Sequence, residues 1–224
     1  MASTPDTPSI GHRDAGDAAS IVYVVDDDDT LRRALSALLR SAGFRVETFG
    51  SSRAFLAFSR PDVPSCLILD VHLDEESGLA VQEEAARAGL HLPILFMTGY
   101  GDVATTVKAM KGGALDFMTK PFDDDEMLDA VGRALARDGE RRAQARALDS
   151  IRDAYATLTP REREVMSQVI AGLMNKQVAA NLGLQEITVK VHRAQVMKKM
   201  LARTLPDLVR KAEALGIQPV GGRD

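Results

Sequence analysis

The N-terminal half of the chain alternates short apolar runs with longer amphipathic stretches, and this alternation restricts the possible folds more than any other feature. The run from Ile21 to Val25 is β-branched, too short for a helix and apolar on both faces, so it predicts a buried strand. Similar runs lie at 44–49, 66–69, 94–97 and, more weakly, 114–118. A helical pattern follows each of the five runs. The first lies between Asp29 and Gly43, and the others lie at about 52–59, 78–88, 103–111 and 124–138. Five strands that alternate with five helices predict an α/β fold, with a doubly wound, five-stranded parallel sheet covered on both faces.

The first helical pattern also indicates where its helix begins and ends. Its apolar stripe runs from Leu31 to Leu39. Asp29 is the expected N-cap, because aspartate accepts hydrogen bonds from the free N–H groups of a first turn. Gly43 is the expected stop, because glycine tolerates the left-handed conformation that ends many helices.

The C-terminal half contains helical patterns only. The segment 139–157 is dense in Arg, Ala, Glu and Gln and lacks Pro, so it predicts a helical linker, although Gly139 weakens its continuity with the preceding helix. Four apolar residues keep 3-4-3 spacing: Leu148, Ile151, Tyr155 and Leu158. This spacing is typical of an interhelical contact, and a solvated helix with one apolar face explains it equally well.

Four short helices are predicted from Thr159 onward. Thr159 to Glu162 supplies an N-cap, a Pro at the first helical position and a Glu at the third, which is a complete capping box. Gly172 and Gly183 stand where the first two helices need to end. The second and third helices, at about 175–182 and 187–200, flank a short turn and form a helix-turn-helix arrangement within an all-α domain.

The two halves differ in charge. Residues 1–138 carry 13 Lys and Arg against 23 Asp and Glu, a net charge of −10, whereas residues 139–224 carry 15 against 9, a net charge of +6. The basic half is therefore the candidate for binding a polyanion.

Composition excludes several other classes of protein. No apolar stretch is long enough to span a bilayer, so no membrane association is expected. Residues 1–19 lack the apolar core of a secretory signal and predict a disordered tail. Cys66 is the only cysteine, which rules out an internal disulfide. The expected location is the cytoplasm.

Charged and hydroxyl side chains stand at the predicted carboxyl ends of the strands, where doubly wound sheets bind their ligands. Asp26 to Asp29 follow the first strand, Asp70 the third, Thr98 the fourth and Lys120 the fifth. Converging carboxylates suit Mg²⁺, and a carboxylate also acts as a nucleophile toward phosphorus. Four consecutive aspartates are by themselves typical of a solvated turn with a helix cap, and Asp28 and Asp29 fit that interpretation. The coincidence at successive strand ends favours a phosphoryl-transfer site.

These motifs resemble the receiver domain of two-component response regulators, whose fold is flavodoxin-like. The matching segments are Val24–Asp27, Leu69–Asp70, Met97–Gly99 and Asp116–Phe122, and the run Thr98–Asp102 resembles the nitrogen-fixation and nodulation branch.

The resemblance implies a role for each residue of the site. Asp70 would accept a phosphoryl group from a phosphohistidine of a sensor histidine kinase. Mg²⁺ would bind Asp27, Asp70 and the backbone carbonyl of His72, with Asp26 assisting through water. Thr98 and Lys120 would contact the phosphoryl group, and Phe117 matches an aromatic switch. One departure is the acidic run Asp74, Glu75 and Glu76, where that family often has a Pro and an apolar residue.

The basic half resembles the LuxR-type effector domain of quorum-sensing and nitrate-response regulators. The matching segments are Leu158–Glu164, Asn175–Ala179 and Thr188–Arg193. The resemblance implies that Thr188 to Met200 enters the major groove of double-stranded DNA, and that the last helix, at about 205–215, pairs across a two-fold axis on inverted half-sites. The implied contacts to bases or nearby phosphates are Lys190, Val191 and Arg193, with Thr188 and Lys176 on the DNA backbone.

The sequence therefore predicts a transcription factor that forms a homodimer on phosphorylation, with RNA polymerase as a further partner. It predicts no enzyme, apart from the receiver's own phosphoryl transfer and autodephosphorylation. Phosphohydrolases with an aspartyl-phosphate intermediate are the competing class, but they use a second Asp as general acid two residues after the nucleophile, where this chain has His72. A receiver that switches without phosphate is a third alternative, which the intact set of Asp27, Asp70, Thr98 and Lys120 disfavours.

The expected organisation is a tail at 1–19, a receiver domain at 20–138, the linker at 139–157, the DNA-binding domain at 158–218 and a tail at 219–224.

Overall fold

The computed structural model describes residues 20–74, 76–99 and 103–219, and it divides into an N-terminal unit that ends at Arg141 and a C-terminal unit that begins at Arg142. The tail predicted at 1–19 and all but the first residue of the tail predicted at 219–224 lie outside the described residues, as do Glu75 and 100–102. No helix of the described segments combines the length and apolar character needed to cross a bilayer.

The N-terminal unit contains a five-stranded parallel sheet in the order β2-β1-β3-β4-β5. The strands are β1 (Ile21–Val25), β2 (Arg45–Phe49), β3 (Ser65–Asp70), β4 (Ile94–Thr98) and β5 (Asp116–Thr119). The helices between them are α1 (Asp29–Ser41), α2 (Ser52–Ala57), α3 (Gly78–Arg87) and α4 (Val103–Lys111), and α5 (Asp124–Ala156) follows β5. The predicted doubly wound fold is confirmed.

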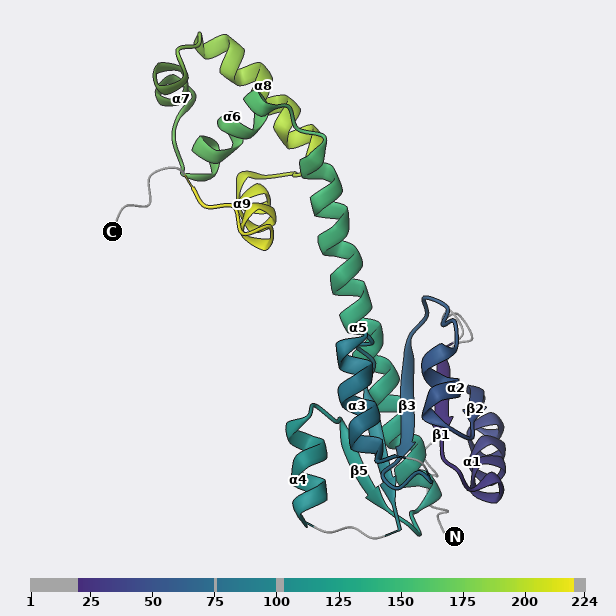
Figure 1. Ribbon diagram of the computed structural model, residues 1–224. Helices are drawn as coiled ribbons and strands as arrows, with labels where there is room; N and C mark the ends of the chain where they lie inside the picture. Colours follow the sequence, from purple (N-terminus) through teal and green to yellow (C-terminus); the bar gives the residue numbers. More distant parts are fainter. Residues whose placement is uncertain (1–19, 75, 100–102, 220–224) are drawn as a thin grey trace, which may run out of the picture. The chain divides into compact units, whose positions relative to one another are not determined.

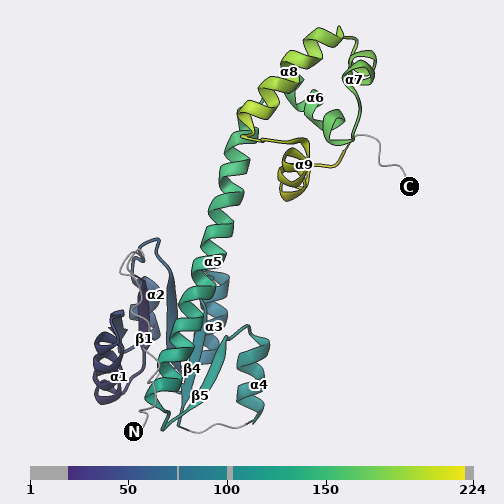
Figure 2. The ribbon, with the colours of Figure 1, turned by 180° about the vertical axis from the view of Figure 1, so that it is seen from behind.

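Alternate residues of each central strand face opposite sides of the sheet, so both sides carry a core. Val22 and Val24 pack with residues of α1 and α5, whereas Tyr23 packs with residues of α2, α3 and α4. Figures 1 and 2 show the two faces of the sheet with these helices over them. This arrangement leaves the carboxyl ends of the strands open as a rim.

The first helix begins one residue earlier than the predicted cap requires. Asp28, and not Asp29, is the N-cap, and its side chain accepts hydrogen bonds from the N–H groups of Thr30 and Leu31. Asp29 lies in the first turn, where its charge interacts favourably with the helix dipole. The stop at Gly43 is confirmed by its left-handed φ of 88°.

The C-terminal unit packs four helices and the last turns of α5 around one apolar core. The four helices are α6 (Pro160–Ile170), α7 (Asn175–Leu182), α8 (Glu186–Lys199) and α9 (Leu205–Ala214). Both halves of the predicted capping box of α6 are present, because Thr159 accepts from the N–H of Glu162 and Glu162 accepts from the N–H of Thr159. Leu158 is buried in this core, and Ile151 and Tyr155 pack against it. Three of the four residues with 3-4-3 spacing thus contact their own unit.

Candidate functional sites

The carboxyl ends of β1, β3 and β5 bring three carboxylates and one ammonium group together. Asp26, Asp27 and Asp70 each offer an oxygen, and these oxygens lie within 4.8 Å of one another. The Lys120 Nζ donates to Asp26 Oδ2 at 2.8 Å and to Asp70 Oδ2 at 2.5 Å. The structure therefore assembles four of the predicted site residues from distant parts of the sequence.

The two buried carboxylates are held in the same way. Asp26 Oδ1 accepts from the N–H of Asp28 at 2.8 Å, and Asp70 Oδ1 accepts from the N–H of His72 at 2.9 Å. Each carboxylate thus has one oxygen bound to a backbone N–H two residues later and the other bound to Lys120. These paired contacts fix the orientation of both groups before any ligand arrives.

Burial shapes the electrostatics of the site. Asp26 is fully buried, and the loss of solvation raises its pKa above the ordinary value even though Lys120 and the N–H of Asp28 act in the opposite direction. Burial alone would lower the pKa of Lys120, but hydrogen bonds and charge from Asp26 and Asp70 outweigh it and raise that pKa. The site therefore holds a charged lysine and a carboxylate whose negative charge is poorly solvated, which favours the arrival of a further cation.

The donor set fits a magnesium ion. Mg²⁺ is a hard cation that prefers oxygen ligands and is usually held through one or two carboxylates. Here the three clustered oxygens come from Asp26, Asp27 and Asp70. Asp27 is half-buried and Asp70 is 6% exposed, so the cluster lies at the rim of the sheet and not in its core.

Thr98 and Phe117 lie on the neighbouring strands β4 and β5. The buried hydroxyl oxygen of Thr98 is 3.4 Å from His72 Nδ1, while the His72 side chain as a whole is exposed. Phe117 is half-buried and packs against the core on the side of the sheet that α2, α3 and α4 cover, with its ring centroid 6.4 Å from that of Phe96. The aromatic side chain therefore stands one strand away from the threonine.

Gly78 is a residue of this site that the sequence motifs did not reveal. A Cβ added to Gly78 would lie 2.2 Å from the carbonyl oxygen of Asp70, and the Gly78 N–H donates to the carbonyl of Val71 at 2.8 Å. Only glycine lets the start of α3 approach β3 this closely. Its position eight residues after Asp70 gives no hint of that contact in the sequence.

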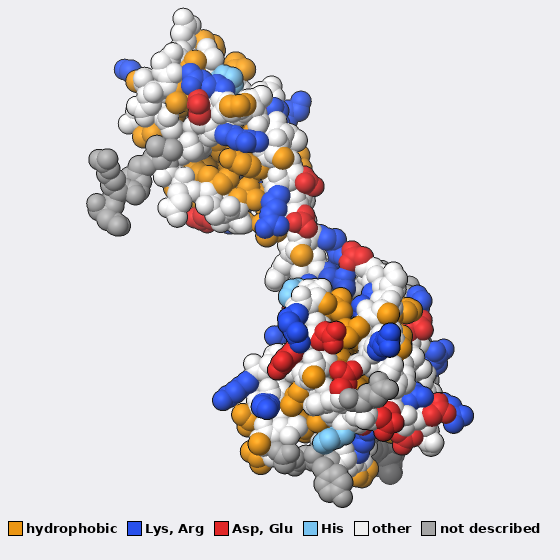
Figure 3. All heavy atoms as spheres, in the orientation of Figure 1, with side chains coloured by type: hydrophobic (Ala, Val, Ile, Leu, Met, Phe, Trp, Pro, Cys, Tyr) orange, Lys and Arg blue, Asp and Glu red, His pale blue; other side chains and the backbone are white. Residues whose placement is uncertain are grey.

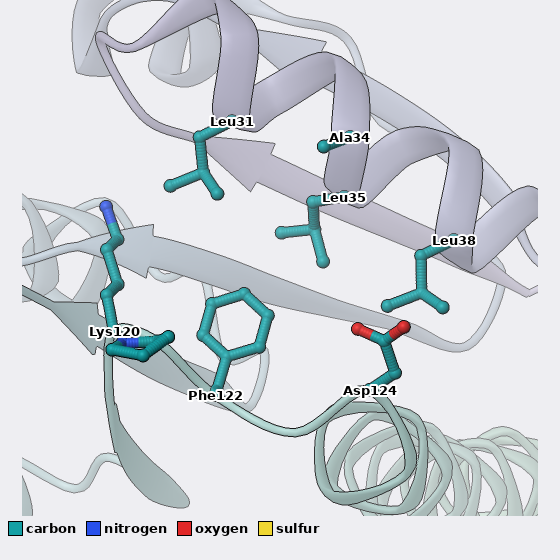
Figure 4. A pocket seen from close by; sticks show the side chains of 8 residues that line it. Leu31, Ala34, Leu35, Leu38, Lys120, Phe122 and Asp124 are labelled. Atoms are coloured by element: carbon teal, nitrogen blue, oxygen red, sulfur yellow. The ribbon is translucent and has the colours of Figure 1, made fainter.

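An apolar pocket of about 610 Å³ borders the acidic site between α1 and the loop that follows β5 (Figure 4). Leu31, Leu35 and Leu38 line one side, and Phe122 projects toward them from the other. Lys120 belongs both to this lining and to the acidic site. An apolar surface thus adjoins the carboxylates.

The C-terminal unit contains the predicted helix-turn-helix. Gly183 ends α7 with a left-handed φ of 64°, and α8 begins at Glu186. Val189, Val196 and Met200 are buried in the core, so the opposite side of α8 faces away from the unit.

The predicted DNA contacts lie at different depths. Lys176 is exposed, Val191 is 56% exposed, and the exposed Lys190 forms an ion pair with Glu186 at 3.2 Å. Thr188 and Arg193 are half-buried, and Arg193 Nη1 donates to Asn175 Oδ1 at 3.1 Å, which ties α8 to the start of α7.

Comparison with known families identifies both units. Residues 22–132 match the model of the response regulator receiver domain, and residues 156–212 match that of bacterial regulatory proteins of the luxR family. The chain belongs to the response regulators. It is a transcription regulator controlled by phosphorylation, in which the receiver implies a histidine kinase partner and the LuxR-type domain implies DNA binding.

Individual relatives agree with this family and with the predicted branch. Nodulation protein W of Bradyrhizobium diazoefficiens is 55% identical to this response regulator over 207 residues, which are 92% of this chain and 91% of that protein. The transcriptional regulatory protein FixJ of Rhizobium meliloti is 41% identical over 199 residues, 88% of this chain and 97% of that protein. The solved structure of the response regulator StyR is 44% identical, with a TM-score of 0.81 over 88% of this chain and 99% of that one.

Proposed function

We propose that Asp70 accepts a phosphoryl group from a phosphohistidine of a sensor histidine kinase. The observation that carries this proposal is the bridge that Lys120 forms between Asp70 and Asp26 at the open rim of the sheet. Both oxygens of Asp70 accept a hydrogen bond, but the partner of Oδ1 is a backbone N–H, whereas that of Oδ2 is the long side chain of Lys120, so Oδ2 is the oxygen favoured for attack.

In the transfer, this oxygen forms the new O–P bond while the P–N bond to the donor histidine breaks. Lys120 then exchanges its contact with Asp70 for contacts with the phosphoryl oxygens, and the hydroxyl of Thr98 donates a second hydrogen bond to them. The chain catalyses only this transfer to itself and the later hydrolysis of its own aspartyl phosphate.

The same proposal includes Mg²⁺. Asp26, Asp27, Asp70 and the backbone carbonyl of His72 would hold the ion, either directly or, for Asp26, through water. When bound, it neutralises part of the negative charge of the incoming phosphoryl oxygens. The raised pKa of Asp26 supports this assignment, because a poorly solvated carboxylate gains most from a neighbouring cation.

Labelling with acetyl phosphate tests the acceptor. In Mg²⁺, Asp70→Asn should abolish the formation of an acyl phosphate, because an amide keeps nearly the same shape but lacks the nucleophilic charge. Asp29→Asn is the matched control, because Asp29 belongs to the same aspartate run but is exposed on α1, and it should label like the wild type. Undiminished labelling of Asp70→Asn would remove Asp70 from its role.

The apolar pocket beside Lys120 is the part of this rim that we assign to the kinase. The donor histidine must approach Asp70 closely, so the kinase has to cover the neighbouring surface. Leu31, Leu38 and Phe122 are half-buried and offer apolar area there, and apolar surface commonly marks protein interfaces.

For the second domain, we propose sequence-specific binding to inverted half-sites of double-stranded DNA. Lys190, Val191 and Arg193 would contact bases or nearby phosphates, and Thr188 and Lys176 the DNA backbone. α9 would pair with its copy across a two-fold axis. A bacterial chromosome lies in the cytoplasm, so this regulator would act there, with RNA polymerase as a further partner.

Phosphorylation would control this binding through dimerisation. Movement of Thr98 toward the phosphoryl group would open space for Phe117 to turn inward and change the surface formed by α4 and β5. α4 already exposes apolar residues at helical spacing, with Val103 81%, Val107 44% and Met110 45% exposed. Such a row supports α4 as part of the dimer contact.

A further inference from the structure

One row of α8 is apolar and points away from the rest of the C-terminal unit. Ile187, Val191 and Ala194 follow one another at spacings of four and three residues, which places them on one side of a helix. Ile187 is 63% exposed and Val191 is 56% exposed, whereas Val189 and Val196 on the opposite side are buried. Lys198 continues the same row toward the end of the helix.

The folded C-terminal unit gains little from this row. Exposed aliphatic side chains contribute almost nothing to hydrophobic burial, and β-branched residues such as isoleucine and valine are weaker helix formers than leucine or alanine. Thr188, by contrast, is half-buried beside them. Two bulky aliphatic residues are thus exposed although burial and helix propensity both disfavour them there. Such a surface is suited to contact with a binding partner outside the unit.

The charges around the row indicate a polyanion with apolar groups. The exposed Lys190 flanks Ile187 and Val191, and it pairs with Glu186 at 3.2 Å on the surface of the same helix. Arg193 and Lys199 belong to the same helix but are engaged within the unit, with Asn175 and Glu162 respectively. The exposed side of the helix therefore presents methyl groups first and cations beside and beyond them.

We propose that Ile187, together with Val191, selects thymine by packing on its C5-methyl group in the major groove. This inference rests on the proposed binding of α8 to DNA. Among the base edges of the major groove, the thymine methyl is the apolar group, and aliphatic side chains recognise it by contact. Ile187 is then a specificity-determining residue that hydrogen-bonding motifs would not reveal.

Replacing thymine with deoxyuridine tests the proposal, because it removes the methyl group and leaves base pairing unchanged. The full-length protein, treated with acetyl phosphate and Mg²⁺, first selects its site from randomised duplexes. In the selected half-site, each thymine is then replaced singly by deoxyuridine, and Kd is measured by fluorescence anisotropy at one fixed salt concentration. At one or two positions the replacement should weaken binding about fourfold, the value for losing one buried methyl-sized group.

The variant Ile187→Ser links the effect to the residue. It should weaken binding to the thymine duplex and reduce the difference between thymine and deoxyuridine to nearly nothing at the position that Ile187 contacts. Ile187→Val should keep part of the difference. Leu201→Ser is the matched control, because Leu201 is 71% exposed but lies beyond the end of α8, and it should preserve the full difference.

The outcomes separate this inference from the function on which it rests. A selected site whose affinity is unchanged by every deoxyuridine, or a methyl effect that Ile187→Ser leaves intact, would overturn the role of Ile187 while DNA binding stands. Failure to select any duplex would instead overturn the proposed DNA-binding function, and the inference with it.

Discussion

At the scale of the residue, Asp26 shows how function opposes stability in the receiver. Its side chain is fully buried, and its pKa is raised mainly by burial, with Lys120 and the N–H of Asp28 opposing the shift. A raised pKa means that the folded state is destabilised as the carboxyl ionises. The wild type loses this part of its stability as pH rises from the ordinary value of 3.8 through the higher folded-state value.

We therefore expect Asp26→Asn to stabilise the protein in the absence of divalent cations. At neutral pH the gain should be about 0.5–2 kcal/mol, the common range for relieving a functional residue of this kind. Thermal unfolding should show a higher Tm for the variant in EDTA, and the difference should shrink as pH falls toward 4 because wild-type Asp26 then becomes protonated. Addition of Mg²⁺ should raise the Tm of the variant less than that of the wild type. A variant that melts below the wild type in EDTA at neutral pH would contradict the electrostatic reasoning.

Sequence reasoning found those residues whose chemistry is visible in the chain. Asp26 and Asp70 stand directly after apolar runs and Lys120 stands two residues after one, so the ends of parallel strands bring them together. Gly78 could not be found in this way, because its requirement for a missing side chain comes from the carbonyl of Asp70 across a loop. The contact of Lys199 with Glu162 is likewise invisible in the sequence, because it joins residues 37 positions apart.

At the scale of the element, a partly buried ion pair positions α8, the second helix of the helix-turn-helix. The end of α8 is joined to the start of α6 because Lys199 Nζ donates to Glu162 at 2.7 Å and to the carbonyl of Thr157 at 3.2 Å. The same carboxylate accepts from the N–H of Thr159 at 2.8 Å. Glu162 thus serves both the cap of one helix and the placement of another.

We expect Glu162→Gln to destabilise the C-terminal unit by about 1–3 kcal/mol, because it weakens charge-assisted hydrogen bonds of a buried group. Hydrogen exchange of the full chain, followed by mass spectrometry, should show faster exchange in peptides from α6 and α8 and little change in the sheet. Glu164→Gln is the matched control, because Glu164 pairs with Arg161 at the surface. Equal exchange in the two variants would contradict the role of Glu162.

The pH dependence of this contact has a definite sign. The hydrogen bond from Lys199, and then that from Thr159, lowers the pKa of Glu162 below the ordinary value of 4.5. Its contribution to stability is therefore complete above pH 4.5 and is lost as pH falls through the lower folded-state value. Glu162→Gln should remove this acid sensitivity from α6 and α8.

α5 is the element whose length the sequence predicts least well. Gly139 suggested a weak join between the receiver and a linker helix, but α5 runs without a break from Asp124 to Ala156. The cost of one glycine in a helix is only about 1 kcal/mol. Next to it, the buried Asp138 accepts from the N–H of Ser65 at 2.9 Å and from Arg141, which holds this turn against the start of β3. Such tertiary contacts are not visible in a local pattern.

At the scale of the whole molecule, the chain joins an acidic receiver to a basic DNA-binding domain. On the face seen in Figure 3, acidic side chains are more numerous on the receiver than on the C-terminal unit. Phosphorylation of a carboxylate replaces its single negative charge by an acyl phosphate that carries roughly −1.5 to −2, so the acidic side becomes more negative by up to about one charge. Direct attraction of the modified receiver for DNA is therefore excluded as the mechanism, and control must pass through a change in conformation or assembly.

Thr98→Ala tests that control, because it removes the hydroxyl proposed to link the phosphoryl group to Phe117. Asp70 keeps its contacts with Lys120 and His72, so acetyl phosphate should still label the variant. Dimerisation and operator affinity should then respond only weakly to the label. In the wild type, by contrast, phosphorylation should promote dimers and tighten DNA binding, because two joined effector domains raise the effective concentration of the second recognition helix. Sedimentation velocity and DNA binding, each measured with and without phosphorylation, supply the comparison. A wild-type protein that is equally dimeric and equally tight on DNA in both states would refute the coupling and leave the two domain assignments standing.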